Sequence, residues 1–110
     1  MTFYLGNIKN YIRENAAYEL SVPELAAAFN YTEKYLGRLF KAKTGLSIKE
    51  FSNKLKVNQA KKLLLETDTS IESVALQTGF NSVTYFDRVF HKVTGLSPNT
   101  YRKLTFKHKL

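Results

Sequence analysis

Two arginines stand fifty positions apart in nearly the same local sequence. Arg38 lies in "KYLGRLFKAKTGLSI" and Arg88 lies in "TYFDRVFHKVTGLSP". A guanidinium group holds its donors in a planar fork, so it can bond two acceptors on the edge of a guanine. An arginine on a helix is also consistent with an ordinary solvated surface. Because the arginine recurs at the same point of both copies, we expect Arg38 and Arg88 to contact bases.

The neighbours of each arginine on its helix face can also bond to bases. Leu36, Leu39 and Phe40 are expected to point inward. Helical spacing then turns a mostly polar stripe outward in the first copy: Glu33, Lys34, Gly37, Arg38 and Lys41. The same positions of the second copy are Val83, Thr84, Asp87, Arg88 and His91. In a major groove, aspartate accepts from cytosine, and threonine or valine touches the thymine methyl group.

Three members of these stripes have a second explanation. Asp87 can pair with His91 one turn later, and Glu33 can simply favour the start of its helix. Gly37 is unusual, because an exposed glycine inside a helix costs about 1 kcal/mol relative to alanine. Either DNA approaches too closely there for a side chain, or the position reads nothing.

Each arginine needs a helix to carry it and further helices to hold that one in place. Positions 31–47 and 81–97 align at an offset of fifty, and both segments end in Thr-Gly-Leu-Ser. A period this long without a third copy argues against a solenoid. Apolar spacing is helical almost throughout, so we predict an all-α fold without strands. The seven predicted helices are Phe3–Asn15, Ser21–Asn30, Thr32–Lys43, Ser47–Glu66, Ser70–Thr78, Ser82–Val93 and a short one from Ser97 and Pro98.

Capping residues indicate where the helices begin and end. Ser21 with Glu24 is the pattern of a capping box, and Leu20 with Leu25 stands at the positions of a hydrophobic staple. Asn30 tolerates the left-handed backbone of a tight turn. Each copy is therefore predicted to be a helix, a tight turn and a second helix.

The packing predicted for each copy is that of a helix-turn-helix unit. Ala26 and Ala75 lie midway along the first helices, where a small side chain lets the second helix cross closely and steeply. The remaining residues expected to point inward are Leu25, Phe29, Leu36, Leu39 and Phe40 in the first copy and Val74, Phe80, Phe86, Val89 and Phe90 in the second. A helical bundle that arose by duplication, with no role in DNA binding, is the alternative.

A long helix between the copies is expected to set their spacing. It divides the chain into a first helix-turn-helix subdomain at residues 1–46, a linker helix at 47–66 and a second subdomain at 67–110. Twenty helical residues span about 30 Å. Two helices that read one face of B-DNA lie about 34–36 Å apart. A linker packed by Phe51, Leu55, Leu63 and Leu64 therefore suits a monomer that binds two half-sites about one turn apart.

The composition excludes several classes of protein. The chain has 110 residues, which suits one domain or two small ones that share a core. Its 44% hydrophobic content, with five Gly and two Pro, is globular. No apolar run approaches the roughly 18 residues of a membrane span, and the start lacks a secretory signal. The absence of Cys excludes disulfides and suits a cytoplasmic location.

The charge indicates a polyanionic partner. Seventeen Lys and Arg stand against nine Asp and Glu, which gives a net charge of +8. Nucleic acid and an anionic membrane surface both fit this balance. We expect no membrane partner, because the apolar stripes are needed in the core.

Catalysis is not expected. The chain has two His, no Cys and no pair of acids at ligand spacing, so we predict no metal, no cofactor, no small-molecule ligand and no enzymatic activity. His91 is better explained as a neighbour of phosphates on an exposed helix. His108 is expected to lie in a frayed basic tail.

The whole chain, from about Tyr4 to Lys103, resembles the DNA-binding domain of the AraC/XylS family of bacterial transcription factors. The resemblance is carried by "NKLKVNQAKKLL" and "GFNSVTYFDRVFHKVTGLSPNTYRK". It implies two reading helices in successive major grooves, with base-reading positions at Lys34, Gly37, Arg38, Val83, Thr84, Asp87 and Arg88. Two positions depart from the family pattern. Gly37 replaces a long polar side chain, and Lys56 replaces an arginine that makes a backbone or structural contact.

A second set of residues is expected to contact the DNA backbone. It consists of hydroxyl and amide side chains near helix starts, together with basic side chains: Ser21, Thr32, Lys41, Lys43, Lys56, Ser70, Asn81, Ser82, His91 and Lys92. Such contacts position a protein on the duplex without reading its sequence.

The resemblance also implies partners. We expect double-stranded DNA as the main partner, contact with RNA polymerase, and a monomeric state for the isolated domain. Most family members carry a sensor or receiver domain before this one, so we favour a C-terminal part of a longer regulator over a complete short protein. The alternative from another class is a helix-turn-helix module that contacts polymerase rather than reading DNA.

Overall fold

The computed structural model describes residues 5–15 and 21–109, and within this range the side chains up to residue 105. The described chain contains seven helices and no strand, which confirms the predicted fold class. The helices are α1 (Leu5–Glu14), α2 (Val22–Ala28), α3 (Glu33–Thr44), α4 (Ile48–Glu66), α5 (Ile71–Gln77), α6 (Val83–Thr94) and α7 (Pro98–Lys109). The predicted start at Phe3 and the staple at Leu20 lie outside the described residues.

The repeated Thr-Gly-Leu-Ser segments make the same set of contacts in both copies. The hydroxyl of Thr44 donates to the carbonyl oxygen of Phe40 at 2.8 Å and accepts from the amide of Leu46 at 3.1 Å. Thr94 makes the equivalent contacts at the same two distances. Gly45 and Gly95 follow with φ of 78° and 81°, a left-handed conformation that strongly favours glycine. The repeat therefore encodes a helix end.

The serine that closes each segment begins the next helix. The Ser47 hydroxyl accepts from the Glu50 amide, and the Glu50 carboxylate accepts from the Ser47 amide, which forms a capping box at the start of α4. The tight turn inside each unit also has a positive φ, at Asn30 (60°) and Gly79 (91°). Both turns lie where the sequence predicts them.

Two hydrophobic cores lie at opposite ends of the long helix α4. Buried residues of the first core are Ile8, Ile12, Leu25, Ala26, Leu36, Phe40 and Ile48. Buried residues of the second are Val57, Ala60, Leu64, Val74, Ala75, Phe80, Phe86, Val89 and Phe90. Phe51 and Leu55 of α4 pack on the first core, and Leu63 packs on the second. The linker helix thus contributes one end to each core.

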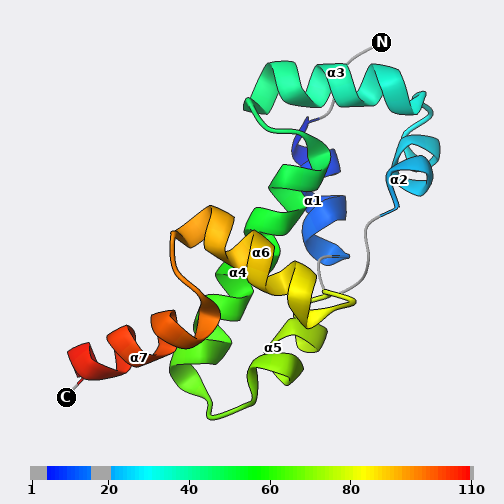
Figure 1. The fold of residues 1–110 in the computed structure, drawn as a ribbon. Coiled ribbons are helices and arrows are strands. Elements are labelled where there is room, and N and C mark those ends of the chain that lie inside the picture. The colour runs from blue at the N-terminus through cyan, green and yellow to red at the C-terminus, as the bar shows by residue number, and fades with distance from the viewer. Residues whose placement is uncertain (1–4, 16–20, 110) are drawn as a thin grey trace.

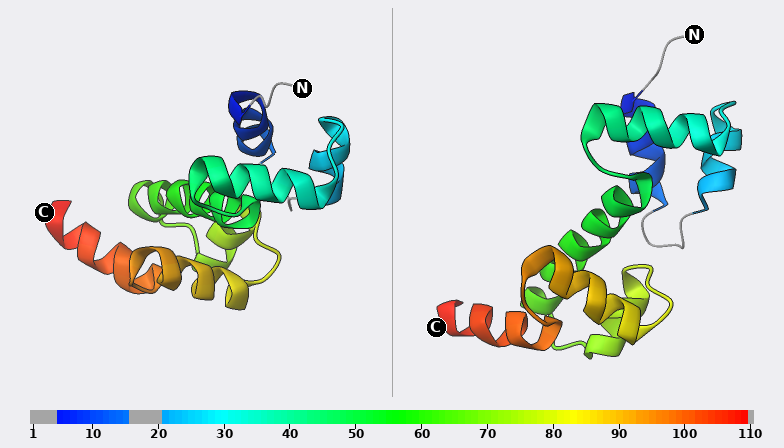
Figure 2. Two further views of the ribbon diagram at one scale, coloured as in Figure 1. Left: turned by 90° about the horizontal axis from the view of Figure 1, so that it is seen from above. Right: turned by 45° about the horizontal axis from the view of Figure 1, so that its top comes forward.

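The molecule is elongated along α4. It measures 53 × 22 × 20 Å, and its radius of gyration is 15.5 Å, against about 13 Å for a compact domain of this size. Figure 1 shows α3 near one end of α4 and α6 alongside its middle and far part. In all three views α3 and α6 run nearly parallel, and both begin on the same side of the molecule (Figures 1 and 2).

The last helix differs from its prediction. It continues to Lys109 instead of ending after a few residues, so the backbone at His108 is helical rather than frayed. The segment after Pro98 contains no glycine or proline that would end a helix. Arg102 holds the first half of α7 against the end of α4. The Arg102 guanidinium donates to the carbonyl oxygens of Leu64 (3.0 Å) and Thr67 (3.2 Å) there.

Candidate nucleic-acid interface

The two predicted reading helices expose most of their outward stripes. In α3 these are Lys34 and Arg38, with Glu33 and Lys41 beside them. In α6 they are Thr84, Asp87 and Arg88, with His91 beside them. The opposite faces of both helices are buried, so the exposed stripes are the surfaces that each unit offers to a partner. Arg38 and Arg88 occupy equivalent places on nearly parallel helices.

Two of the predicted base-reading positions, Val83 and Gly37, are less exposed than the rest of the outward stripes. Val83 is half-buried and packs against the second core, because it lies on the first turn of α6 beside the tight turn. Gly37 is partly covered as well. A Cβ atom built at Gly37 would nevertheless meet nothing within 4 Å, so no neighbour inside the protein requires a glycine there.

Four hydroxyl groups that we expect at the DNA backbone act as helix N-caps. Ser21, Thr32, Ser70 and Ser82 accept a hydrogen bond from a backbone amide three residues on, at 3.3, 3.2, 3.1 and 3.0 Å respectively. Capping uses a lone pair of the oxygen and leaves its proton available. The same hydroxyl can therefore donate to a phosphate oxygen.

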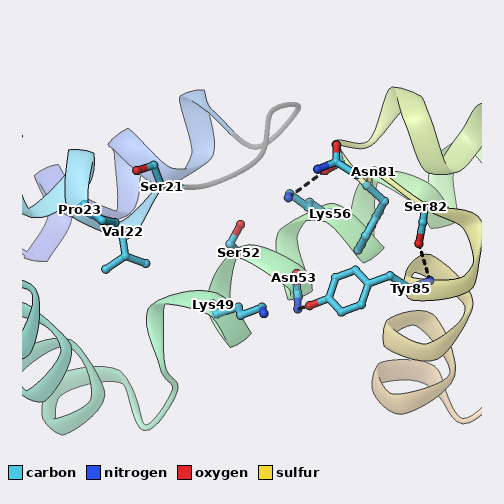
Figure 3. A pocket seen from close by; sticks show the side chains of 12 residues that line it. Ser21, Val22, Pro23, Lys49, Ser52, Asn53, Lys56, Asn81, Ser82 and Tyr85 are labelled. Atoms are coloured by element: carbon cyan, nitrogen blue, oxygen red, sulfur yellow. Dashed lines mark hydrogen bonds between the residues drawn. The ribbon is translucent and has the colours of Figure 1, made fainter.

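A cavity of about 450 Å³ between the two units collects several of these residues (Figure 3). Ser21 comes from the start of α2, Asn81 and Ser82 from the start of α6, and Lys56 from α4. Among the residues that the structure describes, no acidic side chain lines it. The structure thus brings together four backbone candidates that are up to 61 positions apart in the chain.

Lys56 has a structural position within this group. It is only 6% exposed, its ammonium donates to the carbonyl oxygen of Gly79 at 3.1 Å, and it lies 5.4 Å from the centre of the Phe80 ring. Of the two contacts the sequence left open, backbone or structural, the geometry favours the structural one. Lys56 ties α4 to the turn of the second unit.

The sequence reasoning missed four polar residues around the same cavity, namely Lys49, Ser52, Asn53 and Tyr85. Asn53 of α4 donates to the hydroxyl of Tyr85 in α6 at 3.1 Å, and the Lys49 ammonium lies 5.5 Å from the centre of the Tyr85 ring. Lys49, Asn53 and Lys56 follow one another at helical spacing along α4 (Figure 3). The other inward-facing residues of α4 are mostly apolar and pack on the two cores. The polar stripe among them was the signal in the sequence that could have indicated this cavity.

The remaining predicted phosphate contacts lie on exposed basic side chains. Lys41 and Lys43 follow Arg38 toward the end of α3, and His91 and Lys92 occupy the last turn of α6. The pKa of Glu50 is lowered, first by the hydrogen bond from the Ser47 amide and then by the Ser47 hydroxyl. The charges of Lys41 and Lys92 lower it further, so both reading helices carry cations near the start of α4.

Other kinds of site find little support among the described residues. Within residues 5–15 and 21–109, no group of three or more His, Cys, Asp or Glu side chains is placed to hold a metal ion. None of the helices in this range combines the length and the apolar character that a membrane crossing requires.

The chain also matches a known family. Residues 25–104 match the family described as "Helix-turn-helix domain". The chain belongs to the AraC/XylS family of DNA-binding transcription regulators. The match is thus to a transcription-regulator family and to DNA-binding neighbours rather than to a family of enzymes.

Three relatives illustrate the match. An uncharacterised HTH-type transcriptional regulator of Bacillus subtilis, YfiF, is 39% identical over 100 residues, which are 91% of this chain and 32% of the relative. The C-terminal domain of AraT, a response regulator from Geobacillus stearothermophilus, superposes with a TM-score of 0.86 at 30% identity, over 91% of this chain and 84% of that one. The DNA-binding domain of AdpA, solved in complex with a target DNA, has a TM-score of 0.85 at 27% identity, over 94% and 93%.

The family match extends over most of this chain but over a smaller part of its relatives. The chain spans about a third of the length of YfiF and of the melibiose operon regulatory protein of Escherichia coli, two curated relatives that it matches. The match therefore describes the DNA-binding unit and not the signal to which each relative responds.

Proposed function

We propose that this chain binds double-stranded DNA in a sequence-specific manner, with α3 and α6 in successive major grooves. The observation that supports this most is the pair of exposed arginines, Arg38 and Arg88, at equivalent places on nearly parallel helices. The helix α4 that separates them has 19 residues, or about 28 Å. That length suits two helices spaced by about one turn of B-DNA, 34–36 Å.

The side chains divide into two groups by their chemistry. Arg38 and Arg88 are suited to bidentate bonds with guanine, Lys34 and Thr84 to single contacts, and Asp87 to the amino group of cytosine. The capping hydroxyls and the lysines at the ends of α3 and α6 are suited to phosphates. The first group sets the sequence preference and the second sets the register on the duplex.

A selection from random duplexes by the purified domain tests the proposal. We expect an asymmetric consensus with two half-sites about one turn apart, each containing a guanine, and binding by a monomer. Neutralisation of about six to ten phosphates should give a slope near −5 to −9 for log affinity against log salt. A slope shallower than about −2, or a selection without enrichment, would show that DNA is not the main partner.

We also infer that the unit works within a longer regulator that positions RNA polymerase. The support comes from relatives, which are about three times as long and are transcriptional regulators by name. A module that contacts polymerase without reading DNA is the second candidate. It predicts polymerase binding that survives alanine substitution of both Arg38 and Arg88, together with weak duplex affinity for the unaltered domain.

A further inference from the structure

A charged groove lies between α4 and α6. Its volume is about 410 Å³, and it is bounded by Glu50, Asn53 and Lys54 of α4 and by Arg88, Lys92 and Val93 of α6. Lys49 also lines it. The groove thus carries four cationic side chains, from Lys49, Lys54, Arg88 and Lys92, and one carboxylate, from Glu50.

The groove reaches from α6 to the connection between α3 and α4. Its other wall is Leu46 and Ser47, in the connection that follows α3. Lys41 of α3 and Lys92 of α6 both act electrostatically on Glu50, so the ends of the two reading helices flank the same carboxylate. Arg88, which we expect to reach a guanine, forms part of the groove wall. The groove is therefore continuous with the surface of α6 that we expect to face DNA.

We propose that this groove is a further DNA contact, which receives the phosphate backbone between the two major-groove sites. The inference rests on the proposed function. A duplex that offers successive major grooves to α3 and α6 must present the intervening backbone to the surface between them. Lys49 and Lys54 of α4, which were not among the residues predicted to contact DNA, then attract the phosphates.

Glu50 has the opposite effect in the same groove. Its carboxylate repels phosphates and partly offsets the neighbouring lysines, so it limits affinity for every duplex alike. Its role in the capping box does not require the charge, because glutamine can occupy the same position of that motif. Glu50→Gln therefore removes the charge while keeping the helix start.

The experiment compares three single variants of the same chain: Glu50→Gln, Lys54→Gln and the control Lys62→Gln. Lys62 is an exposed lysine of the same helix that lines neither the groove nor the cavity between the units. Affinity for the selected site and for a scrambled duplex is measured by anisotropy over a range of salt concentrations. Thermal unfolding confirms that each variant is folded.

We expect opposite signs at Glu50 and Lys54. Glu50→Gln should raise affinity by about two- to fivefold for both duplexes, the size expected for one exposed charge pair. Lys54→Gln should lower affinity for both and make the salt slope shallower by about 0.9, the value for one phosphate. Lys62→Gln should change the affinity and the salt slope much less than either of the other two variants.

The outcomes separate this inference from the proposed function. If Glu50→Gln and Lys54→Gln both behave like Lys62→Gln while Arg88→Ala still relaxes a base preference, the groove does not face DNA and only the inference fails. If the unaltered domain shows no salt-dependent affinity for duplex, the proposed function fails and the groove contact fails with it.

Discussion

The two helix-turn-helix units share their scaffold and differ in their surfaces. Both use a hydroxyl cap, a positive φ in the turn and the same Thr-Gly-Leu-Ser helix end. On the outward stripes, only Arg38 and Arg88 are the same residue. Lys34 corresponds to Thr84, and Gly37 corresponds to Asp87. The two copies thus share the residues that fold the unit and differ in the residues that they expose.

The units also differ in how firmly α4 holds them. In the second unit, Asn53 bonds the Tyr85 hydroxyl and Lys56 bonds the Gly79 carbonyl, so both α6 and the preceding turn are fixed to α4. The equivalent tyrosine of the first unit, Tyr35, is 53% exposed and stacks on Tyr31 of its own unit, with ring centres 5.7 Å apart. A fixed reading helix loses less conformational entropy on binding, so we expect the second unit to contribute more to recognition.

The largest effect is expected when the two half-sites in the DNA are moved apart. Inserting about five base pairs between them rotates one half-site to the far side of the duplex, and a rigid α4 cannot follow. Affinity should fall about 100- to 10,000-fold, to that of a single unit. An anisotropy titration on the selected site and on its five-pair insertion measures the loss. Comparable binding to the original and the five-pair site would mean that only one unit reads DNA.

The arginines provide the next test. Arg88→Ala and Arg38→Ala should each cost roughly 1–3 kcal/mol of binding and relax the preference at one base pair. We expect the greater loss at Arg88, because α6 is tied to α4 and α3 carries Gly37 beside its arginine. Selection with each variant measures the effect. Lys43→Ala is the matched control and should weaken all sequences alike. Equal losses on specific and scrambled duplex for Arg88→Ala would contradict base contact.

A smaller effect is expected from the tyrosines. Tyr85→Phe removes the hydroxyl that Asn53 bonds, so it should lower the free energy of unfolding by about 0.5–1.5 kcal/mol. Tyr35→Phe alters an exposed side chain and should stay within about 0.5 kcal/mol of the parent. Urea titration of both variants compares the units directly. A loss at Tyr35 as large as that at Tyr85 would show that the second unit is not held more firmly.

The sequence predicted most of the fold because its signals are local. The start of α4 at Ser47, the turn at Asn30 and the helix end at Gly45 each depend on residues within one turn of the chain. The burial of both cores followed from helical periodicity, except at Leu39, which is only partly buried and is not among the residues of the first core. The exposed positions of Arg38 and Arg88 followed from the same periodicity.

The parts that sequence reasoning did not find depend on contacts between distant segments. The sequence left a backbone or a structural contact open for Lys56, because its partner Gly79 is 23 positions away and only the fold brings them together. Val83 looked exposed by its spacing, yet the adjoining turn packs it against the second core. The groove residues Glu50 and Lys54 gain their setting from α6, which the sequence of α4 does not reveal.

The smallest predicted effect concerns Gly37, where the first unit departs most from the second. Gly37→Ala should raise the free energy of unfolding by about 0.5–1 kcal/mol, because alanine favours the helix and a Cβ there has no neighbour within 4 Å. We expect the same variant to bind the selected site more weakly. No neighbour inside the protein requires a glycine at this position, so we expect that DNA approaches too closely there for a side chain. Asp87→Ala at the equivalent position of α6 is the comparison, and it should alter a base preference without a similar gain in stability. Urea titration and anisotropy on each variant measure the two effects separately. A Gly37→Ala variant that is more stable and binds with unchanged affinity would show that this position reads nothing, which would leave Lys34 and Arg38 as the reading residues of the first unit.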